Sequence, residues 1–87
     1  MRVKLVAGNW KMNGNLASSQ ALLKAILPPL SVLNRARYAV CAPFPYLTAV
    51  DQALRGSNVA LGAQDLCQFE DGAYTGGVSG AMLADCR

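Results

Sequence analysis

The chain has 87 residues, of which 53% are hydrophobic and 15% charged, with a net charge of +3. This composition is typical of a single small globular domain and excludes a disordered chain. The basic residues are dispersed and not interleaved with aromatic residues, which argues against nucleic-acid binding, and no apolar stretch approaches the roughly 20 residues that span a bilayer. Three cysteines without paired spacing and the absence of histidine predict no metal site and favour a cytoplasmic protein with reduced thiols.

The first predicted element is a strand over residues 2–7, because its mostly apolar run is typical of a parallel strand covered on both faces. Gly8 is expected to let the backbone leave this strand in a conformation that other residues resist, and Asn13-Gly14 is expected to form a turn with a positive φ. Lys11 lies between these two points. Because α/β sheets bind ligands at the carboxyl edge of their strands, Lys11 is a candidate anion-binding residue; the alternative is a solvated lysine in a surface turn.

A helix is predicted from about Leu16, because leucine and isoleucine side chains recur on one side at helical spacing as far as Leu33. Pro28 and Pro29 cannot donate backbone hydrogen bonds within this helix. We therefore expect a break or a kink at the two prolines.

The second predicted strand covers residues 37–42 and ends at residues 43–45, Pro-Phe-Pro, which favour an extended turn. A short helix is predicted over residues 47–54 from its apolar spacing, with Gly56 placed to end it. Residues 58–63 are mostly apolar and predict a third strand.

A long connection over residues 64–78 carries acidic residues and several glycines. Loops longer than about 12–15 residues are uncommon in compact domains and usually have a function. At its start, Gln64 and Asp65 are expected to hydrogen-bond to loop backbone rather than to take part in chemistry. At its end, Ser79 is predicted to N-cap a last helix that runs through residues 82–83.

The elements follow the order β-α-β-α-β-loop-α, which predicts an α/β fold with parallel strands. Three such strands would leave two unpaired edges. The apolar fraction is also higher than a chain of this length readily buries. We therefore expect residues 1–87 to be the opening of a longer domain.

Three motifs occur in order along the chain. They are Val6-Ala7-Gly8-Asn9-Trp10-Lys11-Met12-Asn13-Gly14, then Cys41-Ala42-Pro43-Phe44-Pro45-Tyr46-Leu47, then Gly62-Ala63-Gln64-Asp65 with Gly72-Ala73-Tyr74-Thr75-Gly76 and Val78-Ser79. Together they resemble the opening signature, the second strand and turn, and the third strand and long loop of the triosephosphate isomerase family. The resemblance implies that residues 1–87 are the N-terminal segment, about the first three βα units, of a (β/α)8 TIM barrel of about 250 residues.

The resemblance also implies an isomerase of glycolysis and gluconeogenesis that interconverts dihydroxyacetone phosphate and glyceraldehyde 3-phosphate through an enediolate, without a cofactor. Its substrate is a small phosphorylated triose. In that family the lysine matching Lys11 faces the negative charge of the substrate, and the asparagine matching Asn9 helps to polarise the reacting carbonyl. A fixed cation beside a developing oxyanion stabilises the transition state more than the ground state.

Members of this family are homodimers, and the resemblance implies the same for the full-length protein. The loop threonine matching Thr75 reaches across the interface in the family and supports the active site of the partner. Tyr74, Gly76 and Met12 are the other residues that the resemblance assigns to the dimer interface.

Several features of the chain depart from the family pattern. It has no histidine, and its one glutamate, Glu70, matches no catalytic position, so we expect the 87-residue segment alone to be inactive. Gly77 stands where the family usually has glutamate, and Gly80 where it usually has alanine or proline, which weakens the expectation of dimer docking. The alternatives are a non-catalytic fragment and an αβ module that binds a phosphate or a partner.

Overall fold

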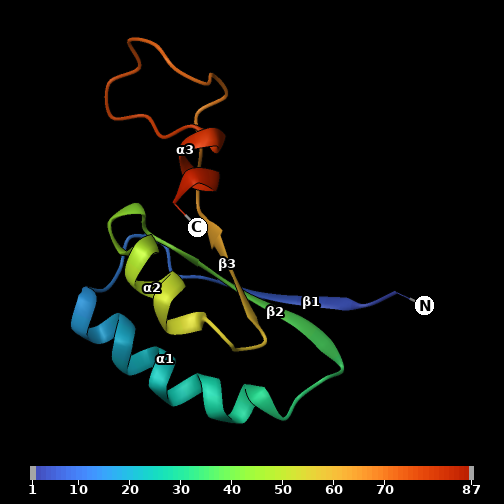
Figure 1. Ribbon diagram of the computed structural model, residues 1–87. Helices are drawn as coiled ribbons and strands as arrows, with labels where there is room; N and C mark the ends of the chain where they lie inside the picture. Colours follow the sequence, from blue (N-terminus) through green and yellow to red (C-terminus); the bar gives the residue numbers. More distant parts are fainter. Residues whose placement is uncertain (1, 87) are drawn as a thin grey trace.

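The computed structural model describes residues 2–86. Its elements are β1 (Lys4–Asn9), α1 (Leu16–Ser31), β2 (Ala36–Ala42), the 3-10 helix η1 (Phe44–Tyr46), α2 (Leu47–Leu54), β3 (Val59–Ala63) and α3 (Gly80–Asp85). The three strands form one parallel sheet in the order β1-β2-β3, and α1 and α2 lie together on one side of it (Figure 1). The predicted α/β order and the parallel pairing are therefore confirmed. Within residues 2–86, none of the helices has the length and apolar character needed to cross a bilayer.

The core lies between the two helices and the sheet. Alternate residues of a strand point to the same face, so Val40 and Ala42 of β2 face the helices together. The buried apolar residues are Leu23, Val40, Ala42, Val50, Leu54 and Val59. Leu16 and Leu33, at the two ends of the predicted apolar stripe of α1, remain about half exposed, so the buried part of the stripe is its centre.

The strand β1 is exposed along its whole length, in contrast to the prediction that it is covered on both faces. It pairs with β2 along one edge, from Lys4 opposite Ala36 to Asn9 opposite Cys41. Leu5 and Val6, which point to opposite faces of the sheet, are 66% and 56% exposed. Within residues 2–86 its neighbour is β2, and no other strand pairs with its second edge.

The chain leaves β1 later than predicted. Gly8 lies inside the strand opposite Val40 and has no positive φ, so the prediction that it opens the turn is wrong. The ladder to β2 satisfies the backbone of β1 as far as Asn9. Gly14 (φ +97°) and Gly56 (φ +78°) do adopt the left-handed backbone expected of the turns after β1 and α2.

The prolines interrupt the chain less than predicted. The helix α1 continues through Pro28 and Pro29 to Ser31. The carbonyl groups that lose their donors belong to Lys24 and Ala25, four residues earlier, and both residues are exposed, so water can satisfy them. After β2, the sequence Phe44-Pro45-Tyr46 forms a short 3-10 helix rather than an extended turn, because the fixed φ of proline also suits a first helical turn.

Candidate functional site

The candidate site is the edge of the sheet at which all three strands end. Asn9 is the last residue of β1, and Lys11 follows two residues later. The side-chain amide of Gln64, the first residue after β3, donates one hydrogen bond to the carbonyl of Lys11 and one to the carbonyl of Cys41 in β2, both at 2.9 Å. The structure therefore brings Asn9, Lys11 and Gln64 to one edge, and Gln64 bonds to loop backbone as the sequence predicts.

Lys11 has a left-handed backbone, with φ +56°, the one such value among the non-glycine residues described. For a residue with a Cβ this conformation costs about 1–2 kcal/mol. Asn9 offsets part of that cost, because its Oδ1 accepts a hydrogen bond of 2.9 Å from the backbone N–H of Lys11. The local sequence does not predict this conformation, because glycine and asparagine adopt it far more often than lysine does.

The side chains of Asn9 and Lys11 are both exposed at this edge and accessible to a ligand. Since Oδ1 of Asn9 accepts the bond from Lys11, the remaining function of its amide is to donate through Nδ2. Within residues 2–86 no hydrogen bond to protein occupies this Nδ2. The site thus offers an amide donor and an ammonium group on residues two positions apart at one edge of the sheet, a combination suited to binding an anionic, oxygen-rich molecule.

The loop between β1 and α1 is anchored to the rest of the fold. The indole of Trp10 packs against the core, and its backbone N–H donates to the carbonyl of Cys41 at 3.0 Å. The amide of Asn13 donates to the carbonyl of Trp10 at 3.0 Å. At the start of α1, Asn15 and Ser18 cap each other's backbone N–H groups in a capping box. These contacts fix the loop that carries Lys11 from both of its ends.

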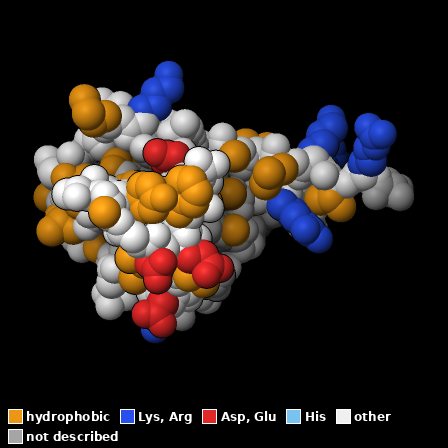
Figure 2. All heavy atoms as spheres, turned by 90° about the horizontal axis from the view of Figure 1, so that it is seen from above, with side chains coloured by type: hydrophobic (Ala, Val, Ile, Leu, Met, Phe, Trp, Pro, Cys, Tyr) orange, Lys and Arg blue, Asp and Glu red, His pale blue; other side chains and the backbone are white. Residues whose placement is uncertain are grey.

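The loop over residues 64–79 projects beyond the carboxyl end of β3 (Figure 1). Its aromatic rings, Phe69 and Tyr74, stack with centroids 4.6 Å apart and planes 11° apart, while both residues stay about half exposed. Figure 2, which looks down on this end of the molecule, shows hydrophobic side chains gathered beside acidic ones.

Three other residues were assigned to the interface from the sequence. Met12 is 95% exposed, Thr75 is exposed and Gly76 has a φ of +84°.

The structure does not bring Thr75 to the edge that carries Lys11. Among the described residues, no hydrogen bond or ion pair joins the tip of the long loop to Asn9 or Lys11. Within a single copy, the hydrogen bonds of the described residues therefore do not connect Thr75 with Asn9 and Lys11.

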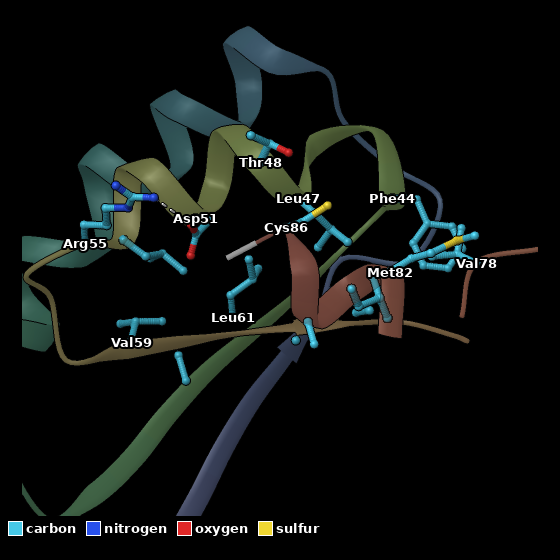
Figure 3. A pocket seen from close by; sticks show the side chains of 16 residues that line it. Phe44, Leu47, Thr48, Asp51, Arg55, Val59, Leu61, Val78, Met82 and Cys86 are labelled. Carbon is cyan, nitrogen blue, oxygen red and sulfur yellow. Dashed lines mark hydrogen bonds and ion pairs between the residues drawn. The ribbon is translucent and has the colours of Figure 1, made fainter. Parts of the chain in front are cut away.

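A hollow of about 520 Å³ lies elsewhere, between α2, β3 and α3 (Figure 3). Its lining is mainly apolar and includes Leu61 and Met82, and the ion pair between Arg55 and Asp51, 3.4 Å long, lies beside it. Neither Asn9 nor Lys11 lines this hollow. Among residues 2–86, no three histidine, cysteine or acidic residues are grouped as metal ligands would be.

Comparisons with known proteins identify the family to which the chain is similar. A family model described as triosephosphate isomerase matches residues 4–87. Proteins named triosephosphate isomerase from Thiobacillus denitrificans and Nitrosomonas eutropha are 54% and 50% identical to this chain over 85 and 88 residues, covering 98% and 99% of it.

The crystal structure of triosephosphate isomerase from Bartonella henselae matches the fold with a TM-score of 0.87 at 34% identity, covering 98% of this chain and 35% of that one. The parallel sheet is therefore part of a (β/α)8 barrel, as the sequence predicts. The chain spans about a third of the length of the curated relatives, 33% and 35% for the two named above. Since the match extends over nearly all of its residues, this chain belongs to the triosephosphate isomerase family.

Proposed function

We propose that this chain is the first third of a triose-phosphate isomerase, and that the complete barrel interconverts dihydroxyacetone phosphate and glyceraldehyde 3-phosphate through an enediolate. One observation carries the proposal. The ammonium-bearing residue Lys11 and the amide-bearing Asn9 stand together at the carboxyl edge of the sheet, in a loop fixed by hydrogen bonds to β2 and to Gln64. In TIM barrels this edge is where active sites are built.

In the proposed reaction, the ammonium of Lys11 binds the negative charge of the substrate and stabilises the charge that develops on the enediolate. Asn9 donates through Nδ2 to a substrate oxygen, since its Oδ1 is engaged with the backbone of Lys11. The backbone of Lys11 and the amide of Asn9 are held before the substrate arrives, which limits the reorganisation needed when charge develops. Removing one such preorganised donor typically costs about 10²–10³-fold in kcat.

The groups that move protons are not supplied by this chain. In this enzyme a glutamate is the base and a neutral histidine the electrophile, roles that we take from the family rather than deduce from these residues. The chain has no histidine, and its one glutamate, Glu70, lies in the long loop and makes no hydrogen bond or ion pair to Asn9 or Lys11 among residues 2–86. By itself the segment would bind charge without catalysing proton transfer, and it is expected to be inactive.

We also propose that the complete protein is a cytoplasmic homodimer that docks through the long loop. The support is the stacked pair Phe69 and Tyr74, which exposes apolar surface at the end of a projecting loop. Exposed apolar patches rimmed by polar residues mark interaction sites. Thr75, Gly76 and Met12 are the further residues of this proposed interface. Thr75 would act on the partner, since among residues 2–86 no hydrogen bond joins it to Asn9 or Lys11 of its own copy.

A hybrid barrel tests the activity. In it, this chain replaces the 85 matched residues of the Thiobacillus denitrificans relative, which supplies the other two-thirds of the barrel. We expect the hybrid barrel to isomerise glyceraldehyde 3-phosphate in a coupled assay, and Lys11→Ala to lower kcat/KM by about 10²–10³-fold. A folded hybrid barrel without activity, or one indifferent to Lys11→Ala, would contradict the proposal. The 87-residue chain assayed alone should show no turnover above its own Lys11→Ala variant.

A further inference from the structure

Both backbone polar groups of Lys11 are held by side chains. Its N–H donates to Oδ1 of Asn9, and its carbonyl accepts from Nε2 of Gln64, each at 2.9 Å. A left-handed backbone at a residue with a Cβ persists only where the surroundings hold it. Asn9, at the end of β1, lies two residues from Lys11, so its bond is local in sequence. Gln64 is 53 residues away, just after β3, and among residues 2–86 it is the one hydrogen-bond partner that joins Lys11 to a distant part of the chain.

The amide of Gln64 links the ends of all three strands. Gln64 follows β3, donates to the carbonyl of Lys11 after β1, and donates to the carbonyl of Cys41 in β2. The carbonyl of Cys41 also accepts from the backbone N–H of Trp10, at 3.0 Å, so the same bond system fixes the start of the loop. Because both partners of Gln64 are acceptors, only its NH₂ end can satisfy them, and the orientation of the amide is determined by its partners.

We propose that Gln64 is a positioning residue for the isomerisation: by holding the carbonyl of Lys11, it fixes the left-handed backbone that directs the ammonium of Lys11 over the edge of the sheet. Both hydrogens of its NH₂ group are engaged by carbonyls, so Gln64 donates nothing to a substrate and acts through Lys11. This inference rests on the proposed function, since it assigns a role within the same site.

A double-mutant cycle in the hybrid barrel tests the proposal. Gln64→Met keeps the length of the side chain and removes both donors. We expect it to lower kcat/KM by about 10- to 100-fold, because a displacement of about 1 Å in a catalytic group can cost 10²-fold. In the Lys11→Ala background the same substitution should lower kcat/KM by less than about threefold, since residues that act through one another are non-additive.

Asn58 provides a matched control at the opposite edge of the sheet. It precedes β3 as Gln64 follows it, and its amide also donates to two backbone carbonyls, those of Leu30 at 2.8 Å and Leu33 at 3.3 Å. We expect Asn58→Leu to lower Tm by an amount similar to Gln64→Met while leaving kcat/KM within about twofold, because additivity holds for sites that share no partners. A purely structural role of Gln64 would make the two variants behave alike.

The outcomes separate this inference from the proposed function. A hybrid barrel that folds but is inactive contradicts the proposed function itself. So does a Lys11→Ala substitution that leaves its activity unchanged. If Lys11→Ala lowers activity but Gln64→Met lowers it equally with and without Lys11, or not at all, the positioning role is overturned. Gln64→Glu serves as a second variant of equal length if Gln64→Met does not fold. Failure of both to fold would assign Gln64 to stability alone and overturn the proposal as well.

Discussion

Replacing Lys11 by glycine is expected to make the hybrid barrel more stable and much less active. At φ +56°, a residue with a Cβ carries about 1–2 kcal/mol of strain that glycine does not. Glycine loses more conformational entropy on folding, by about 0.5–1 kcal/mol. The net gain expected for Lys11→Gly over Lys11→Ala is therefore about 0.5–1 kcal/mol, since alanine removes the same amine but keeps the Cβ. The ammonium of Lys11 makes no ion pair within residues 2–86 that its loss would break.

The two variants should differ in stability and agree in activity. Chemical denaturation measures the first: the midpoint of unfolding should be higher for Lys11→Gly than for Lys11→Ala at an unchanged m value. Thermal unfolding should show a difference of about 1–4 °C, because 1 kcal/mol shifts Tm by about 2–4 °C in a barrel of this size. In the isomerase assay both variants should lose about 10²–10³-fold in kcat, because both lack the ammonium.

Gly14→Ala is a control that should change the stability of the barrel in the opposite direction to Lys11→Gly. Gly14 has φ +97°, and an added Cβ would meet Oγ of Ser18 at 3.3 Å, so alanine there should destabilise the barrel. If Lys11→Gly were no more stable than Lys11→Ala while Gly14→Ala behaved as expected, the argument that Lys11 is held in a strained backbone would be wrong. If either Lys11 variant kept full activity, the role of the ammonium would be refuted.

Three further substitutions test local features. Asn15→Ala removes the capping box of α1 and should lower the free energy of unfolding by about 1 kcal/mol in a urea titration, with no change if the cap contributes nothing. Gly80→Ala should raise it by up to about 1 kcal/mol, because the position lies in the first turn of α3 and the added Cβ meets open space. Gly72→Ala would place a Cβ 2.8 Å from the ring of Tyr74, at a φ of +129°, so it should break the aromatic stack and weaken dimerisation in sedimentation; unchanged association would argue against the loop as the interface.

The parts of the fold that depend on local sequence could be predicted. The alternation of apolar patterns indicated three parallel strands, and Ser79 caps α3 through a bond of 3.1 Å to the N–H of Met82 as expected. Gly14 and Gly56 occupy left-handed turns because glycine has no Cβ. Gln64 was correctly assigned to loop backbone, although the particular carbonyls were not, since these belong to other strands.

The sequence-based predictions that failed have a common physical origin, since the structure at these positions depends on the tertiary environment. The ladder to β2 keeps Gly8 in an extended strand although glycine also permits a turn. The left-handed backbone of Lys11 depends on a hydrogen bond to a residue 53 positions away, and no local pattern signals it. Solvent around Lys24 and Ala25 lets α1 continue through two prolines. At each of these positions the tertiary environment overrides the intrinsic preference of the residue.

The bare outer edge of β1 has a consequence for handling the chain by itself. Among residues 2–86, no strand pairs with one side of β1, and its apolar side chains such as Leu5 and Val6 are open to water. Such a strand is a template for further β-pairing. In this strand the charge of Lys4 is the main obstacle to such growth. Produced without a complementary segment, the polypeptide is expected to aggregate with rising concentration. Preparations that are kept dilute, or refolded together with the other two-thirds of the Thiobacillus denitrificans relative, should retain most of the protein in solution.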